Sequence, residues 1–151
     1  MNQERKLKLE RRLEKQKRKS KEEYSVLFKE CIASLSEGTI IYSQEQSNRI
    51  YNDLPEKYEF TTYGRVNMEV HVFEELTIND LLNHITKKEK CIVLWSHGND
   101  PVIQVDLAEA INNLDEILAV SPDVWLYRVD EYVIEFLHDG VIRKFYRSKD
   151  S

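Results

Sequence analysis

The sequence predicts an α+β domain, in which a mostly antiparallel sheet of about five or six strands is packed by three or four helices. Three observations predict this class. Residues 121–147 have the pattern of a β-meander, residues 91–107 have the pattern of a buried hairpin, and several segments before each of them repeat apolar residues at helical spacing. The fold class follows from strands that return on themselves and helices with a single apolar face.

The C-terminal meander carries the clearest pattern. Three runs rich in β-branched and aromatic residues are separated by Asp130-Glu131 and by His138-Asp139-Gly140, and Asp-Gly suits the positive φ angles of a tight hairpin. Alternation in the middle run places Glu135 on the face opposite Ile134. The three predicted strands are residues 124–129, 132–137 and 141–146.

The first elements are predicted in the order helix, strand, helix. Apolar residues recur at helical spacing over residues 24–35, and Gly38 is expected to end that helix. Residues 39–42 are a short strand candidate. Ser43 and Gln46 then have capping-box spacing, which predicts a second helix that runs toward residues 54–55.

The periodicity is weaker over residues 57–76. Residues 60–66 are compatible with an edge strand or an ordered loop, and residues 69–73 with a short extended piece. A cap pattern at residues 77–80 predicts a short helix whose apolar positions reach Ile85, with Lys87-Lys88 at its end.

The central strand is predicted at Cys91 to Trp95, an apolar run of the kind that is covered on both faces. Residues 97–101 form a turn, and residues 102–107 return as the hairpin mate. Asp106 is expected to cap one continuous helix with a buried stripe from Leu107 to Leu118.

Length and charge divide the chain in two. The 151 residues are sufficient for one domain, assigned to residues 22–151. Residues 1–21 hold 10 Lys/Arg against 3 Glu and are expected to be a frayed helix or a disordered basic extension, whereas residues 22–151 hold 12 Lys/Arg against 24 Asp/Glu. A domain with a balance of −12 repels nucleic acid and favours a basic partner, or is simply kept in solution by its charge.

Compartment and redox state follow from what is absent from the sequence. No apolar run approaches the roughly 20 residues that span a bilayer, and the N-terminal residues lack the apolar core of a secretory signal. We therefore expect a cytoplasmic protein without membrane contact. Cys31 and Cys91 are expected to be buried structural thiols, because each is surrounded by apolar neighbours.

Catalytic patterns are not found. No phosphate-binding glycine motif, nucleophile elbow, zinc motif or C-x-x-C pair occurs, and the four histidines lack metal-ligand spacing. Ser96, His97 and Asp100 are close in sequence, but residues of one tight turn do not by themselves form a catalytic triad. The sequence therefore predicts a protein that is not an enzyme and has no metal, cofactor or small-molecule substrate.

Carboxylates and aromatic residues are interleaved along the meander. Three interpretations are open: a solvated sheet face, a pair of carboxylates for acid and base chemistry, or a docking face for a basic protein. The predicted partner-binding residues are Asp123, Trp125, Asp130, Glu131, Glu135 and Asp139.

From Tyr24 onward the chain resembles the immunity proteins of bacterial contact-dependent growth inhibition (CDI) and related polymorphic toxin systems. The segments that carry the resemblance are residues 27–31, 63–67, 92–96, 121–127 and 132–140. The resemblance implies a non-enzymatic antidote that binds the C-terminal domain of one cognate toxin, often a nuclease, and occludes or distorts its active site. The acidic balance of the domain agrees with a basic, nucleic-acid-binding toxin as partner.

Two other functions remain open at this point. One is a nucleic-acid-associated regulatory protein that uses the basic arm of residues 1–21, a segment that departs from the family pattern. The other is a small hydrolase built on carboxylates or on His97.

Overall fold

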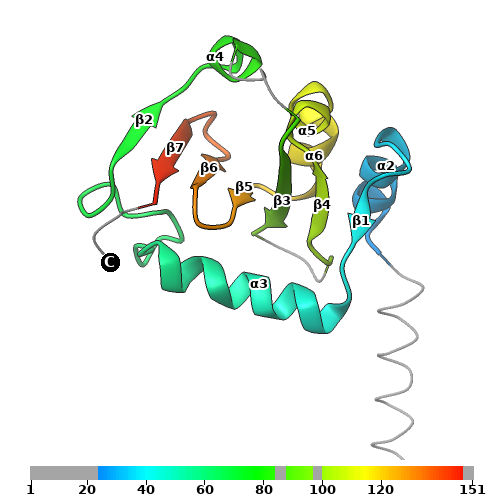
Figure 1. Cartoon of the computed structure of the whole chain (residues 1–151), viewed down its shortest axis with the longest axis horizontal. Coiled ribbons are helices and arrows are strands. Elements are labelled where there is room, and N and C mark those ends of the chain that lie inside the picture. The colour runs from blue at the N-terminus through cyan, green and yellow to red at the C-terminus, as the bar shows by residue number, and fades with distance from the viewer. Residues whose placement is uncertain (1–23, 84–87, 97–99, 148–151) are drawn as a thin grey trace, which may run out of the picture.

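Seven strands form one antiparallel sheet in the computed structural model, which describes residues 24–83, 88–96 and 100–147 (Figure 1). The described part also holds five helices, so both counts exceed the expectation while the α+β class and the C-terminal meander are confirmed. The helices are α2 (Val26–Ser34), α3 (Gln44–Lys57), α4 (Ile78–Asn83), α5 (Leu107–Asn112) and α6 (Leu114–Val120). The strands are β1 (Ile40–Ile41), β2 (Phe73–Glu75), β3 (Lys90–Trp95), β4 (Ile103–Asp106), β5 (Val124–Arg128), β6 (Tyr132–Phe136) and β7 (Ile142–Tyr146).

The strand order is β1-β4-β3-β5-β6-β7-β2, with every neighbouring pair antiparallel. The meander and the β3–β4 hairpin form as predicted, and pairing of β3 with β5 joins them into one sheet. Gly140 has a φ angle of 89°, which confirms the left-handed backbone predicted for the Asp139-Gly140 turn. Asp130, in the β5–β6 turn, also has a positive φ angle, of 67°. The meander therefore makes up half of the sheet, while the two shortest strands lie at its edges.

Helices cover both faces of the sheet (Figure 1). On one face a core contains Phe28 from α2, Leu81 from α4 and Ile117 from α6, packed on strand residues such as Val93 and Leu126. The second core lies on the opposite face, beneath α3 and the loop that follows it. Its buried residues are Leu54, Tyr58, Val66, Leu94, Val102, Trp125, Tyr127, Val133 and Phe145.

The predicted caps at Ser43 and Thr77 form, whereas the cap predicted at Asp106 and two helix ends differ from the prediction. Ser43 and Gln46 form the capping box of α3. The first helix ends at Ser34 because Leu35 turns into extended backbone and becomes buried, so the expectation that Gly38 ends it is wrong. The helix predicted over residues 107–118 is two helices that meet at Asn113, and Asp106 precedes the first of them without a side-chain capping hydrogen bond.

The segment that was ambiguous in sequence is an ordered loop followed by an edge strand. Phe60 and Val66 form an isolated antiparallel bridge, and the strand at the sheet edge begins at Phe73. Thr77 and Asp80 cap each other's backbone N–H at the start of α4. Ile85 and Lys87, predicted to end that helix, lie outside the described residues, as does the basic extension of residues 1–21.

Cys31 and Cys91 are both free and buried, as predicted. Among the helices that the structure describes, none has the length and apolar character needed to cross a membrane.

Candidate functional site

The six predicted partner-binding residues fall in three separate places. Asp123 and Asp139 lie at the end of the sheet where β5 begins and β6 ends, whereas Asp130 and Glu131 lie at the opposite end, in the β5–β6 turn. A five-residue strand is about 17 Å long, so the two pairs are at different edges of the molecule. The remaining two, Trp125 and Glu135, are in the interior.

The placement of Trp125 and Glu135 corrects the expectation that they are offered to a partner. Trp125 is 7% exposed and Glu135 is completely buried. One carboxylate oxygen of Glu135 accepts hydrogen bonds from the indole Nε1 of Trp125 at 2.9 Å and from the backbone N of Val66 at 2.8 Å. Both side chains therefore hold the loop of residues 58–67 onto the sheet, and neither can reach a partner in this structure.

The environment of Glu135 favours its neutral form. Burial raises the pKa of its carboxyl above the ordinary value near 4.5, and the hydrogen bonds from Trp125 and Val66 only partly oppose this. Its other carboxylate oxygen, Oε1, has no hydrogen-bond partner. Arg143 is the residue directly opposite on β7, and it also lowers the pKa.

Asp123 and Asp139 are at the surface but are engaged locally. Asp123 is only 19% exposed, and one of its oxygens contacts both the backbone N and the ring Nδ1 of His138, at 2.9 and 3.0 Å. Asp139 forms an ion pair of 3.3 Å with Arg65. A hydrogen bond from the backbone N of Val141, followed by the charge of Arg65, lowers the pKa of Asp139, so this carboxylate stays charged.

The β5–β6 turn presents its carboxylates outward. Asp130 is exposed, and the Glu131 side chain is 54% exposed although one of its oxygens accepts a hydrogen bond of 2.5 Å from Nε of Arg128. Arg128 also donates to the backbone carbonyl of Lys90 at 2.9 Å and lies 3.9 Å from Glu89. This network fixes the turn relative to the start of β3.

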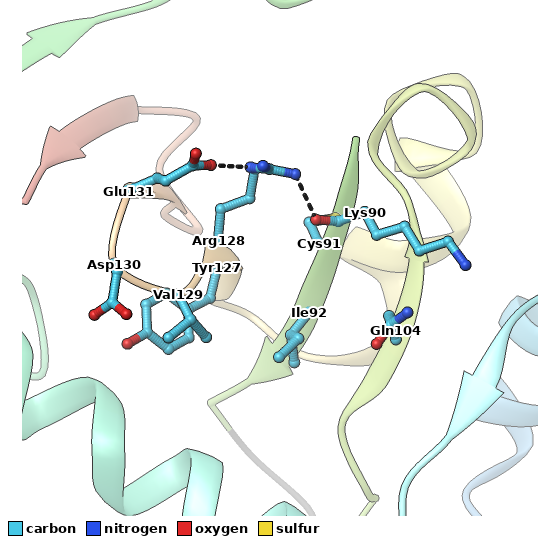
Figure 2. A pocket seen from close by; sticks show the side chains of 9 residues that line it. All are labelled: Lys90, Cys91, Ile92, Gln104, Tyr127, Arg128, Val129, Asp130 and Glu131. Atoms are coloured by element: carbon cyan, nitrogen blue, oxygen red, sulfur yellow. Dashed lines mark hydrogen bonds and ion pairs between the residues drawn. The ribbon is translucent and has the colours of Figure 1, made fainter. Parts of the chain in front are cut away.

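A groove of about 460 Å³ lies beside this turn, at the ends of β3, β4 and β5. Figure 2 shows Glu131, Arg128 and the Lys90 carbonyl linked on one side of it, and Tyr127, Val129 and Ile92 on the other. Its lining residues are Lys90, Cys91, Ile92, Gln104, Tyr127, Arg128, Val129, Asp130 and Glu131. The lining combines charged groups of both signs with apolar side chains, which suits contact with another protein surface.

A contact between this turn and α3 could not be predicted from the sequence. The hydroxyl of Tyr127 donates a hydrogen bond of 2.7 Å to the carboxylate of Asp53, which ties α3 to the end of β5. Burial and the neighbouring Asp53 charge raise the pKa of the Tyr127 hydroxyl, so it remains a donor at physiological pH. Partners 74 residues apart leave no spacing signal in a single sequence.

The grouping of Ser96, His97 and Asp100 has a structural explanation for one member. The Asp100 carboxylate accepts hydrogen bonds from the backbone N and hydroxyl of Ser25, at 2.9 and 2.7 Å. It therefore anchors the start of α2, while His97 and His84 lie outside the described residues. Within residues 24–83, 88–96 and 100–147, no group of three or more His, Cys, Asp or Glu side chains is placed to hold a metal ion.

The fold is that of a small α+β domain that carries charged side chains on the turns of its sheet. A protein-family model described as CdiI immunity protein, EcoliA0-like, matches residues 25–145. Because this match spans well over half of the chain, the protein belongs to the CdiI immunity protein family. It is thus an immunity protein against a CDI toxin, as the resemblance implied. The comparison with curated proteins gives no significant match.

Proposed function

We propose that this immunity protein neutralises a basic, nucleic-acid-cleaving toxin domain by binding it through an acidic surface that blocks access to its active site. The observation that carries the proposal is the charge of the domain, with 24 Asp/Glu against 12 Lys/Arg over residues 22–151. A nuclease must bind phosphates with Lys and Arg, and carboxylates can take the place of those phosphates.

The β5–β6 turn supports this mechanism better than the other predicted positions. Asp130 and Glu131 are exposed, so their charge acts on an approaching partner. Asp123 and Asp139 remain candidates, but their side chains are less exposed, 19% and 42% against 54% for Glu131. Trp125 and Glu135 are set aside as contact residues because they are buried.

Blocking requires no chemistry from the antidote. A protein interface that covers about 800 Å² per partner excludes a nucleic acid from a site that it overlaps. Charge pairing accelerates the encounter, and the desolvated centre of the interface then determines how slowly the complex dissociates.

The proposal is tested with the C-terminal domain of the open reading frame that precedes this gene, used as the candidate toxin domain. We expect the double variant Asp130→Lys/Glu131→Lys to associate with that domain about tenfold or more slowly at low ionic strength, and to lose most of the salt dependence of association. The matched control is Glu30→Lys/Glu37→Lys, which changes the net charge equally at exposed positions on and after α2.

Two outcomes would contradict the proposal in different ways. If wild-type association does not depend on salt concentration, the role of charge is wrong. If only the control variant associates slowly, the acidic surface lies elsewhere than the β5–β6 turn. Protection of cells that express the toxin provides the second measurement.

The basic arm is tested separately. Residues 1–21 lie outside the matched range of 25–145, so deletion of the arm should leave protection and toxin affinity unchanged. A regulator that uses the arm to bind nucleic acid would instead lose RNA or DNA binding on deletion.

A further inference from the structure

We propose that the apolar centre of the toxin interface is the pair Val70 and Val72, at the end of β7 next to the β5–β6 turn. This inference rests on the proposed function and names the surface that performs it. Val72 is 75% exposed and Val70 is 54% exposed, although each carries a side chain that is normally buried. Trp125 was expected to supply that centre and is buried instead.

The valines and the β5–β6 turn flank the same strand end. The backbone N of Tyr146 donates to the carbonyl of Val72 at 3.0 Å on one side of β7. On the other side, the backbone N of Arg147 donates to the carbonyl of Glu131, also at 3.0 Å. Because neighbouring strands lie about 4.8 Å apart, Val72 and Glu131 are separated by about 10 Å, well within one protein interface.

The segment that carries the valines is held firmly. The backbone N of Glu59 donates to Nε2 of His71 at 2.8 Å, and the His71 ring packs against Tyr58 with centroids 5.4 Å apart. Arg147 donates from Nη1 to the carbonyl of Lys57 at 3.1 Å, which fastens the end of α3 to the end of β7. A surface ordered in advance loses less conformational entropy when it binds.

Charges around the valines match a basic partner. Four exposed carboxylates border them, from Glu69, Glu74, Asp130 and Glu131. Among the described residues, the basic side chains of this strand end, Lys144 and Arg147, are half-buried and already engaged. Lys144 places Nζ 4.3 Å and 5.0 Å from the ring centroids of Tyr132 and Tyr146, and Arg147 contacts the Lys57 carbonyl. An apolar centre with an acidic border is complementary to an apolar patch bordered by Lys or Arg.

The test removes apolar surface without changing charge. We expect Val70→Ser/Val72→Ser to raise the Kd for the same purified candidate toxin domain about tenfold or more, mainly through faster dissociation. The matched control is Val26→Ser/Leu27→Ser, at positions 69% and 45% exposed on α2, which should change the Kd less than threefold. Calorimetry or surface plasmon resonance provides the measurement, with thermal unfolding as a check of the fold.

Each outcome separates this inference from the function on which it rests. If the wild type binds the toxin domain tightly and Val70→Ser/Val72→Ser binds equally well, the surface is wrong and the antidote function stands. If the wild type does not bind the toxin domain, the proposed function fails. Should the double variant unfold, Val70→Ser alone gives the answer, because residue 70 lies outside β2 and its pairing with β7.

Discussion

The indole Nε1 of Trp125 donates a hydrogen bond of 2.9 Å to the Glu135 carboxylate, directly across the pairing of β5 and β6. The same carboxylate oxygen accepts the backbone N–H of Val66, so one buried acid joins two strands and the loop that covers them. Phe60, at the other side of that loop, packs edge-on against the Trp125 ring with centroids 5.7 Å apart. Trp125 and Glu135, which were expected to recognise a partner, are thus buried and hold a surface loop in place.

Replacement of Glu135 should destabilise the fold. We expect Glu135→Ala to lower the free energy of unfolding by about 2–4 kcal/mol, because two buried N–H donors lose their acceptor. Glu135→Gln retains an acceptor oxygen and should lower it by about 1 kcal/mol. Urea denaturation followed by tryptophan fluorescence measures both, and equal values for the two variants would contradict this role.

Stability should also depend on pH through Glu135. Its pKa is raised in the folded protein, so the folded state binds this proton more tightly than the unfolded state does. The contribution is therefore complete below about pH 4.5 and declines as pH rises through the folded pKa. The difference in unfolding free energy between the wild type and Glu135→Gln should fall across that window, in urea titrations from pH 4 to pH 8. A difference that is constant with pH would mean that the carboxyl has its ordinary pKa.

The contributions of Ser25 and Asp100 to the free energy of unfolding should be coupled. The Ser25 hydroxyl accepts from the backbone N of Phe28 as the cap of α2 and donates to the buried carboxylate of Asp100. We expect Ser25→Ala and Asp100→Ala each to lower the free energy of unfolding by about 1–3 kcal/mol. In the double variant the loss should be smaller than the sum by about 1 kcal/mol. Strict additivity in this double-mutant cycle would show that the contact does not contribute.

The two thiols should be unreactive while the protein is folded. Burial, with a smaller contribution from Glu116, raises the pKa of Cys31 to about 11, and burial raises the pKa of Cys91 to about 12. Because the thiolate is the reactive form, Ellman's reagent at pH 8 should modify neither residue at an appreciable rate, and both after unfolding in urea. Rapid modification of the folded protein would indicate local opening, and Cys91→Ser would then identify the residue.

Local sequence patterns predicted the elements whose signals are themselves local. The meander turns depend on Asp130 and on Gly140, and the start of α3 depends on Ser43 with Gln46, so neighbours in sequence suffice. The stripe from Leu107 to Leu118 has the spacing of one helix, and nothing in that spacing marks the break at Asn113. Gly38 does not mark the end of α2, because burial of Leu35 ends this helix earlier.

The candidate site was less predictable because burial depends on distant segments. Alternation correctly placed Glu135 on the face opposite Ile134, because Ile134 lies in the core on one face of the sheet and Glu135 is hydrogen-bonded to Trp125 on the other. It could not show that this face is covered, because the cover comes from Val66, 69 residues earlier in the chain. Exposure of Val70 and Val72 has the same origin, since it depends on how β2 joins the edge of β7.

The order of strands in the sheet has a consequence for synthesis of the protein. β3 pairs with β5, and β2 pairs only with β7, so strands made early must wait for partners near the C-terminus. A ribosome that stops before residue 124 releases a product with β3 unpaired along one side and β2 without a neighbour. Such a fragment lacks the buried residues that β5, β6 and β7 contribute to both cores and should be degraded, so an interrupted message yields no partial antidote.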